Sequence, residues 1–264
     1  MIISNILTIA QRELQAYFTT PIAYIIATFF WFVSGWFFVE ILIGEQGIVQ
    51  QIIISERMGM DIGSIDAANE FLSSFLTILE TLSLLIVPIL SMGLYAEERK
   101  HGTLELLATS PITNWAVALG KLIAVVLLFT VMIFPAFIYE AIAFSTVDPP
   151  LSPILPILGH LGLILLVASL LSLGMFVSSL TNSTILSAIL TSSLILLIWM
   201  LELVATNTSG WFKDFLLHIS LIESYSNLVR GIVSFSDFIL FFSYIFLGLF
   251  LTAQSISLLR LSRR

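Results

Sequence analysis

Six long apolar stretches dominate the sequence. A helix needs roughly 20 mostly apolar residues to cross a bilayer, and six segments reach that length, at about 21–43, 72–95, 114–140, 153–178, 184–204 and 237–258. The pattern predicts an all-α integral membrane protein with six transmembrane helices, built as one transmembrane domain over residues 1–264.

Residues 1–20 follow a different period. Apolar side chains recur at three- and four-residue intervals opposite polar ones, which is typical of a helix that lies in the membrane interface. Pro21 then favours the start of a new helix that enters the bilayer. A frayed leader is the alternative. The apolar positions are Ile2, Ile3, Ile6, Leu7, Ala10, Leu14 and Phe18.

Two short apolar clusters lie between the fifth and sixth spans, one at 211–219 and one at 228–233. Each is too short to cross the membrane, so we expect a re-entrant pair of helices joined by a polar bend near Tyr225, with Gly210 and Gly231 near the helix ends. An amphipathic loop on the membrane surface is the alternative.

Composition and charge fix the class and the orientation. A mean hydropathy of +1.07 exceeds what the core of a soluble protein can hide. With the N-terminus inside, seven Lys and Arg residues face the cytoplasm and three face outward, which predicts cytoplasmic termini in a plasma (inner) membrane. No removable signal peptide is recognisable. A sequence pI near 4.8 argues against a nucleic-acid partner.

The segment YAEERKHGTLELLATSPIT, residues 95–113, concentrates charge in a cytoplasmic connection between spans two and three. Thr103 fits a helix N-cap, Leu104 and Leu107 share one face, Glu105 lies in the first turn, and Pro111 ends the run. A helix this short needs a partner surface for its leucines. The alternative is a charged loop that only fixes the topology.

The longer run PILSMGLYAEERKHGTLELLATSPITNWAVALGK, residues 88–121, resembles the coupling-helix region in membrane subunits of type-2 ABC exporters. It looks most like the branch associated with gliding motility and with copper-site maturation of nitrous oxide reductase. The resemblance implies that two permeases pair, as a homodimer or with a close paralogue, and that each docks a coupling helix on a separate ATPase subunit. That subunit would bind ATP and Mg. An extracytoplasmic accessory protein is a further candidate partner, besides membrane lipid.

The resemblance assigns ATPase coupling to the residues of this segment. Leu104 and Leu107 would fill an apolar socket, and the charged side chains would pair around its rim. The chain is not expected to be an enzyme by itself, because its Gly120–Lys121 pair lacks the remainder of a phosphate-binding loop. The coupling residues are Glu97, Glu98, Arg99, Lys100, Gly102, Thr103, Leu104, Glu105, Leu107 and Pro111.

Polar groups within the spans supply pathway candidates. Glu80 lies deep in span two, where it either bonds to a Ser or Thr of span five or serves as a polar point on the export path or a proton-coupling acid. The resemblance suggests that the hairpin around Tyr225 gates the outer exit. Glu140 is expected within reach of headgroup water, and His160 has no ligand set around it. We expect neither a catalytic nor a metal site.

Two other functions remain open at this level. A proton-coupled secondary transporter would use Glu80 and need no ATPase, although it would leave the charged segment without a role. A membrane anchor for an ATPase in an envelope or motility machine would not transport.

Overall fold

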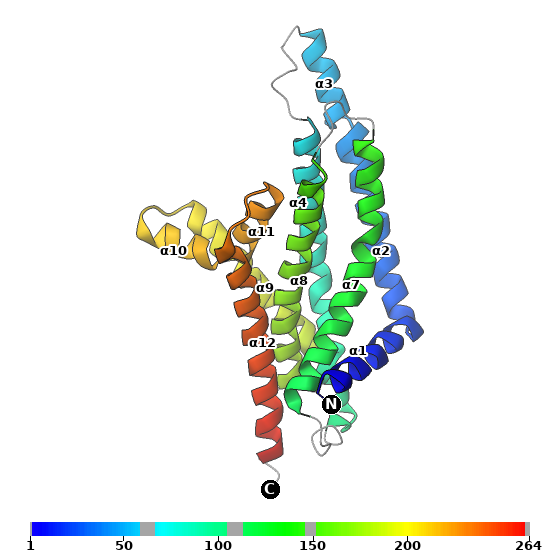
Figure 1. The fold of residues 1–264 in the computed structure, drawn as a ribbon, viewed down its shortest axis with the longest axis vertical. Helices are drawn as coiled ribbons and strands as arrows, with labels where there is room; N and C mark the ends of the chain where they lie inside the picture. Colours follow the sequence, from blue (N-terminus) through cyan, green and yellow to red (C-terminus); the bar gives the residue numbers. More distant parts are fainter. Residues whose placement is uncertain (1, 59–66, 105–112, 146–151, 262–264) are drawn as a thin grey trace.

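A computed structural model describes residues 2–58, 67–104, 113–145 and 152–261 of the chain. Helices make up the described structure, and Figure 1 shows them arranged as an elongated bundle with both termini at the same end. They are α1 (Ile2–Thr19), α2 (Pro21–Ile43), α3 (Ile48–Arg57), α4 (Ala67–Ser91), α5 (Gly93–Lys100), α7 (Asn114–Phe144), α8 (Ile154–Leu180), α9 (Thr184–Thr206), α10 (Trp211–Ile219), α11 (Leu221–Val229) and α12 (Phe235–Leu261).

Six of the described segments are long and apolar enough to cross a membrane. They contain α2, α4, α7, α8, α9 and α12, at the places where the hydropathy pattern predicts spans. The prediction of six transmembrane helices is therefore confirmed. It succeeds because a span must be continuously apolar over the thickness of the bilayer.

Helix α8 forms the centre of the bundle. It packs against α4, α7, α11 and α12, and most of its side chains are buried. The contact with α12 is close at Gly248, where a Cβ atom would collide with Ser172. Serine hydroxyls on α8 add bonds across this contact: Ser169 donates to the Phe241 carbonyl at 3.1 Å and Ser172 to the Tyr244 carbonyl at 3.2 Å.

Helix α1 crosses the base of the bundle and leads into α2 at Pro21 (Figure 1). Its contact with α7 depends on Gly120, because a Cβ there would meet the side chain of Ile9 at 2.7 Å. Ala10 is buried, whereas Ile2, Ile3 and Leu7 are exposed. The predicted N-terminal helix is present, and its place in the membrane interface stays a prediction.

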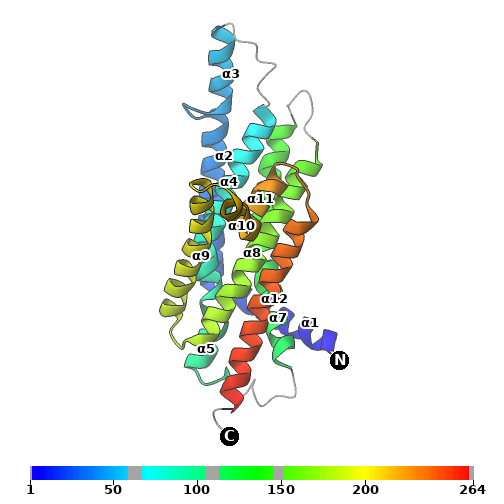
Figure 2. The ribbon, with the colours of Figure 1, turned by 90° about the vertical axis from the view of Figure 1, so that its left-hand side faces the viewer.

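The segment between α9 and α12 forms two short helices, as expected. Helix α10 coincides with the first apolar cluster at 211–219, whereas α11 covers 221–229 and ends before the last residues of the second cluster at 228–233. Gly210 precedes α10 and Gly231 follows α11, both with positive φ, at 78° and 77°. The bend lies at Ser220, so the expected polar bend near Tyr225 is wrong. The Ser220 hydroxyl accepts a hydrogen bond from the Glu223 amide at 3.2 Å and starts α11 before the polar residues are reached. Helix α11 packs against α8 and α10 against α9, and α10 projects from the side of the bundle (Figure 1 and Figure 2).

Candidate functional site

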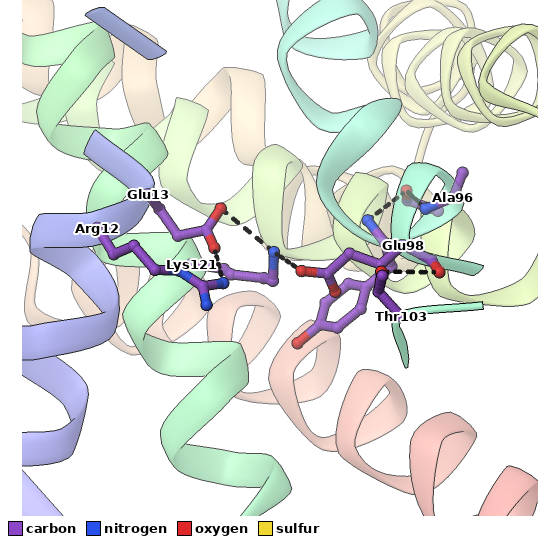
Figure 3. Close-up of polar contacts among 8 residues, drawn as sticks. Arg12, Glu13, Ala96, Glu98, Thr103 and Lys121 are labelled. Carbon is purple, nitrogen blue, oxygen red and sulfur yellow. Dashed lines mark hydrogen bonds and ion pairs between the residues drawn. The ribbon is translucent and has the colours of Figure 1, made fainter. Parts of the chain in front are cut away.

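A buried lysine joins three helices at the base of the bundle. Lys121 lies in the second turn of α7, and its side chain is only 3% exposed. Its Nζ atom is 2.9 Å from Oε1 of Glu98 on α5 and 3.3 Å from Oε2 of Glu13 on α1. Figure 3 shows the ammonium group between the two carboxylates. We call Glu13, Glu98 and Lys121 the basal triad.

Neighbouring groups stabilise the basal triad. Arg12 pairs with the other oxygen of Glu13 at 2.8 Å, and the Tyr95 ring lies under Lys121 with its centroid 5.3 Å from Nζ. Burial raises the pKa of Glu13, but Lys121 and Arg12 together outweigh it, so the pKa of Glu13 lies below its ordinary value. Glu13 is therefore charged at neutral pH and holds α1 against α7.

A second link joins the same region to α8. The helix is interrupted at Met92, between α4 and α5. This break lies four residues after Pro88, which is inside α4. The Ser178 hydroxyl donates to the Met92 carbonyl at 2.8 Å and accepts from the amides of Tyr95 and Ala96 at 3.1 and 3.0 Å. Met92 is the N-cap of α5, and the Tyr95 amide spans the break, because in a continuous helix it would bond to the Ser91 carbonyl at the end of α4. Ser178 thus bridges the break.

Helix α5 is tied to α8 once more at its far end. Arg99 donates from Nη1 to the carbonyl of Ser179 at 2.6 Å. Thr103 donates from its hydroxyl to the Glu98 carbonyl at 3.2 Å, which holds the turn after α5 (Figure 3). The segment from Gly93 to Leu104 is therefore held against the bundle by side-chain contacts.

The expected coupling residues divide into exposed and internal ones. Glu97, Lys100, Gly102 and Thr103 are exposed, and Gly102 adopts a φ of 72° that favours glycine. Glu98 and Arg99 are half-buried and bond within the chain, and their expected pairing around a socket on a partner stays a prediction.

The role expected for Leu104 is corrected. Leu104 is 5% exposed and belongs to the chain's own hydrophobic core, so its side chain is not free to fill a socket on a partner. Glu105, Leu107 and Pro111 lie outside the described residues.

The pathway candidates lie further along the bundle. Glu80 on α4 is 8% exposed, and among the described residues it forms no hydrogen bond to a Ser or Thr of α9. Tyr225 on α11 is 1% exposed, and its hydroxyl donates to the Leu76 carbonyl of α4 at 3.0 Å. Tyr225 therefore locks α11 onto α4 within one chain, and it presents no surface to a second copy.

Two further groups are more buried than the sequence suggests. Glu140 is 1% exposed, which corrects the expectation that water reaches it. Its Oε2 atom is 3.6 Å from Nδ1 of His160, which also lies 2.9 Å from the Pro156 carbonyl and stacks on Phe137. The described residues contain no group of three or more potential metal-ligating side chains.

The sequence did not identify the roles of Lys121, Glu13 and Ser178. Lys121 was considered as a cytoplasmic charge and in the Gly120–Lys121 pair, but not as a buried group. A lysine in the second turn of an apolar span is itself a signal, since burial requires a partner. Ser178 carried no signal, because serine is common in spans and its partner lies on another helix.

One comparison with known proteins identifies a family. A family model described as "ABC-2 family transporter protein" matches residues 7–262. A search of curated proteins found no significant match. The matched region begins within α1 and ends at the end of α12, so it includes both the basal triad and the α10–α11 hairpin.

Proposed function

The chain belongs to the ABC-2 transporter family and is a membrane permease subunit of an ABC transporter; we propose that a separate ATPase subunit drives it to export a substrate. The observation that carries the proposal is the basal triad, which connects the charged segment to two other helices through one buried ammonium group. A docking element must transmit displacement to the bundle, and these contacts supply the connection.

The exposed residues of this segment are suited to the docking role. Glu97 and Lys100 present opposite charges next to each other at the base, on a helix whose remaining charged residues bond internally. Exposed charges of this kind orient a partner and set its approach more than they add affinity. The ATPase would therefore contact α5 and the turn after it.

Movement of α5 would reach the bundle by two routes. Through Glu98 and Lys121 it would act on α7 and, through Glu13, on α1. Through Ser178 it would act on α8 at the α4–α5 break. Pro88 in α4 and Pro135 in α7 each remove a helical hydrogen bond, which provides points where these helices can bend.

The remaining features of the assembly belong to the same proposal. ATP and Mg would bind to the partner subunit, and the chain would act as a homodimer or with a close paralogue. Both termini would face the cytoplasm, since the bundle end that carries them also carries the basal triad (Figure 1). The chain itself would have no catalytic role.

Copurification tests the proposal directly. The tagged permease, expressed with a candidate ABC ATPase, is purified in detergent and then reconstituted in vesicles. We expect the ATPase to copurify and its hydrolysis rate to change on binding. A permease that transports with a proton gradient and no ATPase, and loses transport in Glu80→Gln, would be a secondary transporter. A stable complex whose vesicles show no nucleotide-driven change in thiol accessibility would be a membrane anchor.

A further inference from the structure

A cavity of about 320 Å³ opens where α10, α11 and the start of α12 meet. This end of α12 is opposite the end that lies near the basal triad (Figure 1). Pockets that hold small molecules begin at roughly this size. The lining is Asp214, Leu217, His218, Glu223, Ser224, Asn227, Ser234, Ser236 and Asp237.

The charge of the lining is one-sided. Asp214, Glu223 and Asp237 contribute three carboxylates, one from each helix, and no Lys or Arg lines the cavity. Three carboxylates around one cavity repel one another and lower the affinity for anions. A cation that enters the cavity would relieve this repulsion.

Asp237 provides a second, independent observation that points to a ligand. The residue is only 7% exposed, and its Oδ2 atom is buried with no hydrogen-bond partner in the protein. Its position in the first turn of α12 favours a negative charge there, but the helix dipole does not supply a donor to this oxygen. A buried acceptor without a donor costs free energy, so a donor is expected from outside the chain.

The remaining polar groups could orient a donor. His218 lies with Nδ1 3.2 Å from the Asp214 carbonyl, so when Nδ1 donates to that carbonyl, Nε2 is free to accept. Asn227 and Ser224 add neutral polar side chains to the same lining. The walls therefore offer mainly acceptors, and they suit a ligand that carries several N–H groups.

The geometry favours an organic cation over a bare metal ion. In the described part of the chain, no three potential ligands lie close enough together to hold a metal, and the cavity is far larger than an ion. We propose that this cavity binds a small organic cation with ammonium or guanidinium groups, with Asp237 and Glu223 as its principal anionic contacts. The proposal is independent of the exporter function, because it needs neither ATPase nor nucleotide.

Spermidine, a small flexible amine with three ammonium groups, is a suitable probe. The purified permease is placed in neutral phosphatidylcholine nanodiscs at about 0.15 M salt, where long-range attraction is screened, and binding is measured by calorimetry. We expect one saturable site per chain. We expect Asp237→Asn to weaken it about tenfold or more, since a charge-assisted hydrogen bond is lost.

The controls separate a built site from general attraction. Glu45→Gln removes one charge from an exposed residue between α2 and α3, outside the cavity, and should leave the affinity unchanged. Glu223→Gln provides a second test if Asp237→Asn disturbs the start of α12. Absence of saturable binding, or an equal loss in Glu45→Gln, would overturn the proposal. Saturable Ca²⁺ binding that spermidine does not displace would also overturn it in favour of a metal site.

Discussion

The hydroxyl of Ser178 donates a 2.8 Å hydrogen bond to the carbonyl of Met92, at the break between α4 and α5. The same oxygen accepts from the amide of Tyr95, which in a continuous helix would bond to the carbonyl of Ser91, so a side chain of α8 is inserted into the hydrogen-bond ladder where α4 meets α5. Insertion of this kind is a recognised cause of helix kinks. The orientation of α5 is therefore set by α8 as well as by its own chain.

Ser178→Ala should destabilise the permease. The change leaves the Met92 carbonyl without its side-chain donor and two buried amides without their side-chain acceptor, and an unsatisfied buried group costs about 1–3 kcal/mol. Thermal unfolding in detergent measures the effect. Ser193→Ala is the matched control, because its exposed hydroxyl bonds only to the Ile189 carbonyl of its own helix. Equal stability of the two variants would show that the insertion contributes little.

Removal of Lys121 alone should cost more than neutralisation of the entire basal triad. Lys121→Met leaves Glu98 and Glu13 as neighbouring carboxylates without their shared ammonium, and loss of one partner from a buried ion pair costs about 3–5 kcal/mol. Lys121→Met combined with Glu13→Gln and Glu98→Gln removes the repulsion and should recover part of this loss. Thermal unfolding of the single and triple variants decides. A triple variant that is less stable than Lys121→Met would contradict the assignment.

Glu13 should make the stability depend on pH at acidic values. Burial raises its pKa, but Lys121 and Arg12 lower it further, so the folded pKa lies below the unfolded value of about 4.3. Its contribution is therefore present above about pH 4.3 and is lost as the pH falls through the folded pKa.

A comparison of the permease with Glu13→Gln tests this dependence. At pH 7 the variant should unfold at a lower temperature, and the difference should shrink as the pH falls below about 4. Glu45→Gln, which alters an exposed carboxylate, should show no such convergence. A difference that stays constant with pH would mean that the charge of Glu13 is not what stabilises the contact.

The sequence predicts those parts of the fold that depend on the surroundings of each segment, which are lipid or the membrane interface. Apolar length locates the spans, and the three- and four-residue period locates α1, because lipid and interface act on each segment separately. Contacts between helices are not encoded in this way. Lys121 pairs with residues from two other helices, and one sequence does not show which helices are neighbours.

Local chemistry explains the two misplaced elements. The start of α11 depends on Ser220 as a cap, and a polar run at 223–226 is compatible both with a bend and with the face of a short helix. The sequence pattern around Leu104 is typical of a leucine that docks on a partner protein. In the structure, however, Leu104 is buried in the core of the bundle. Such cases are decided by packing, which the pattern of one segment does not contain.

Single thiols can establish the orientation, since the chain has no cysteine. Cysteines at Ser4 and His101 should resist a membrane-impermeant reagent applied from outside, because these positions lie at the end of the bundle that carries the basal triad. Cysteines at Gln46 and Asn207 should react, since both residues are exposed and lie after α2 and α9. Labelling at position 101 from outside would place α5 on the wrong side for an ATPase.

Charge reversal at Glu97 and Lys100 should weaken ATPase association without loss of the fold. Both side chains are exposed, so Glu97→Lys and Lys100→Glu alter the proposed docking surface and leave the basal triad intact. We expect the single variants to reduce copurification of the ATPase, while thermal unfolding changes by no more than about 0.5 kcal/mol, as is usual for surface substitutions.

Leu104→Asp is the informative contrast. Its side chain is buried in the permease core, so a carboxylate there should lower the stability of the permease itself by several kcal/mol, and any loss of the ATPase would then follow from misfolding. A Leu104→Asp permease that is fully stable and fails only in ATPase binding would mean that this leucine docks on the partner. In that case the apolar face of the segment, and not Glu97 and Lys100, would form the main contact with the ATPase.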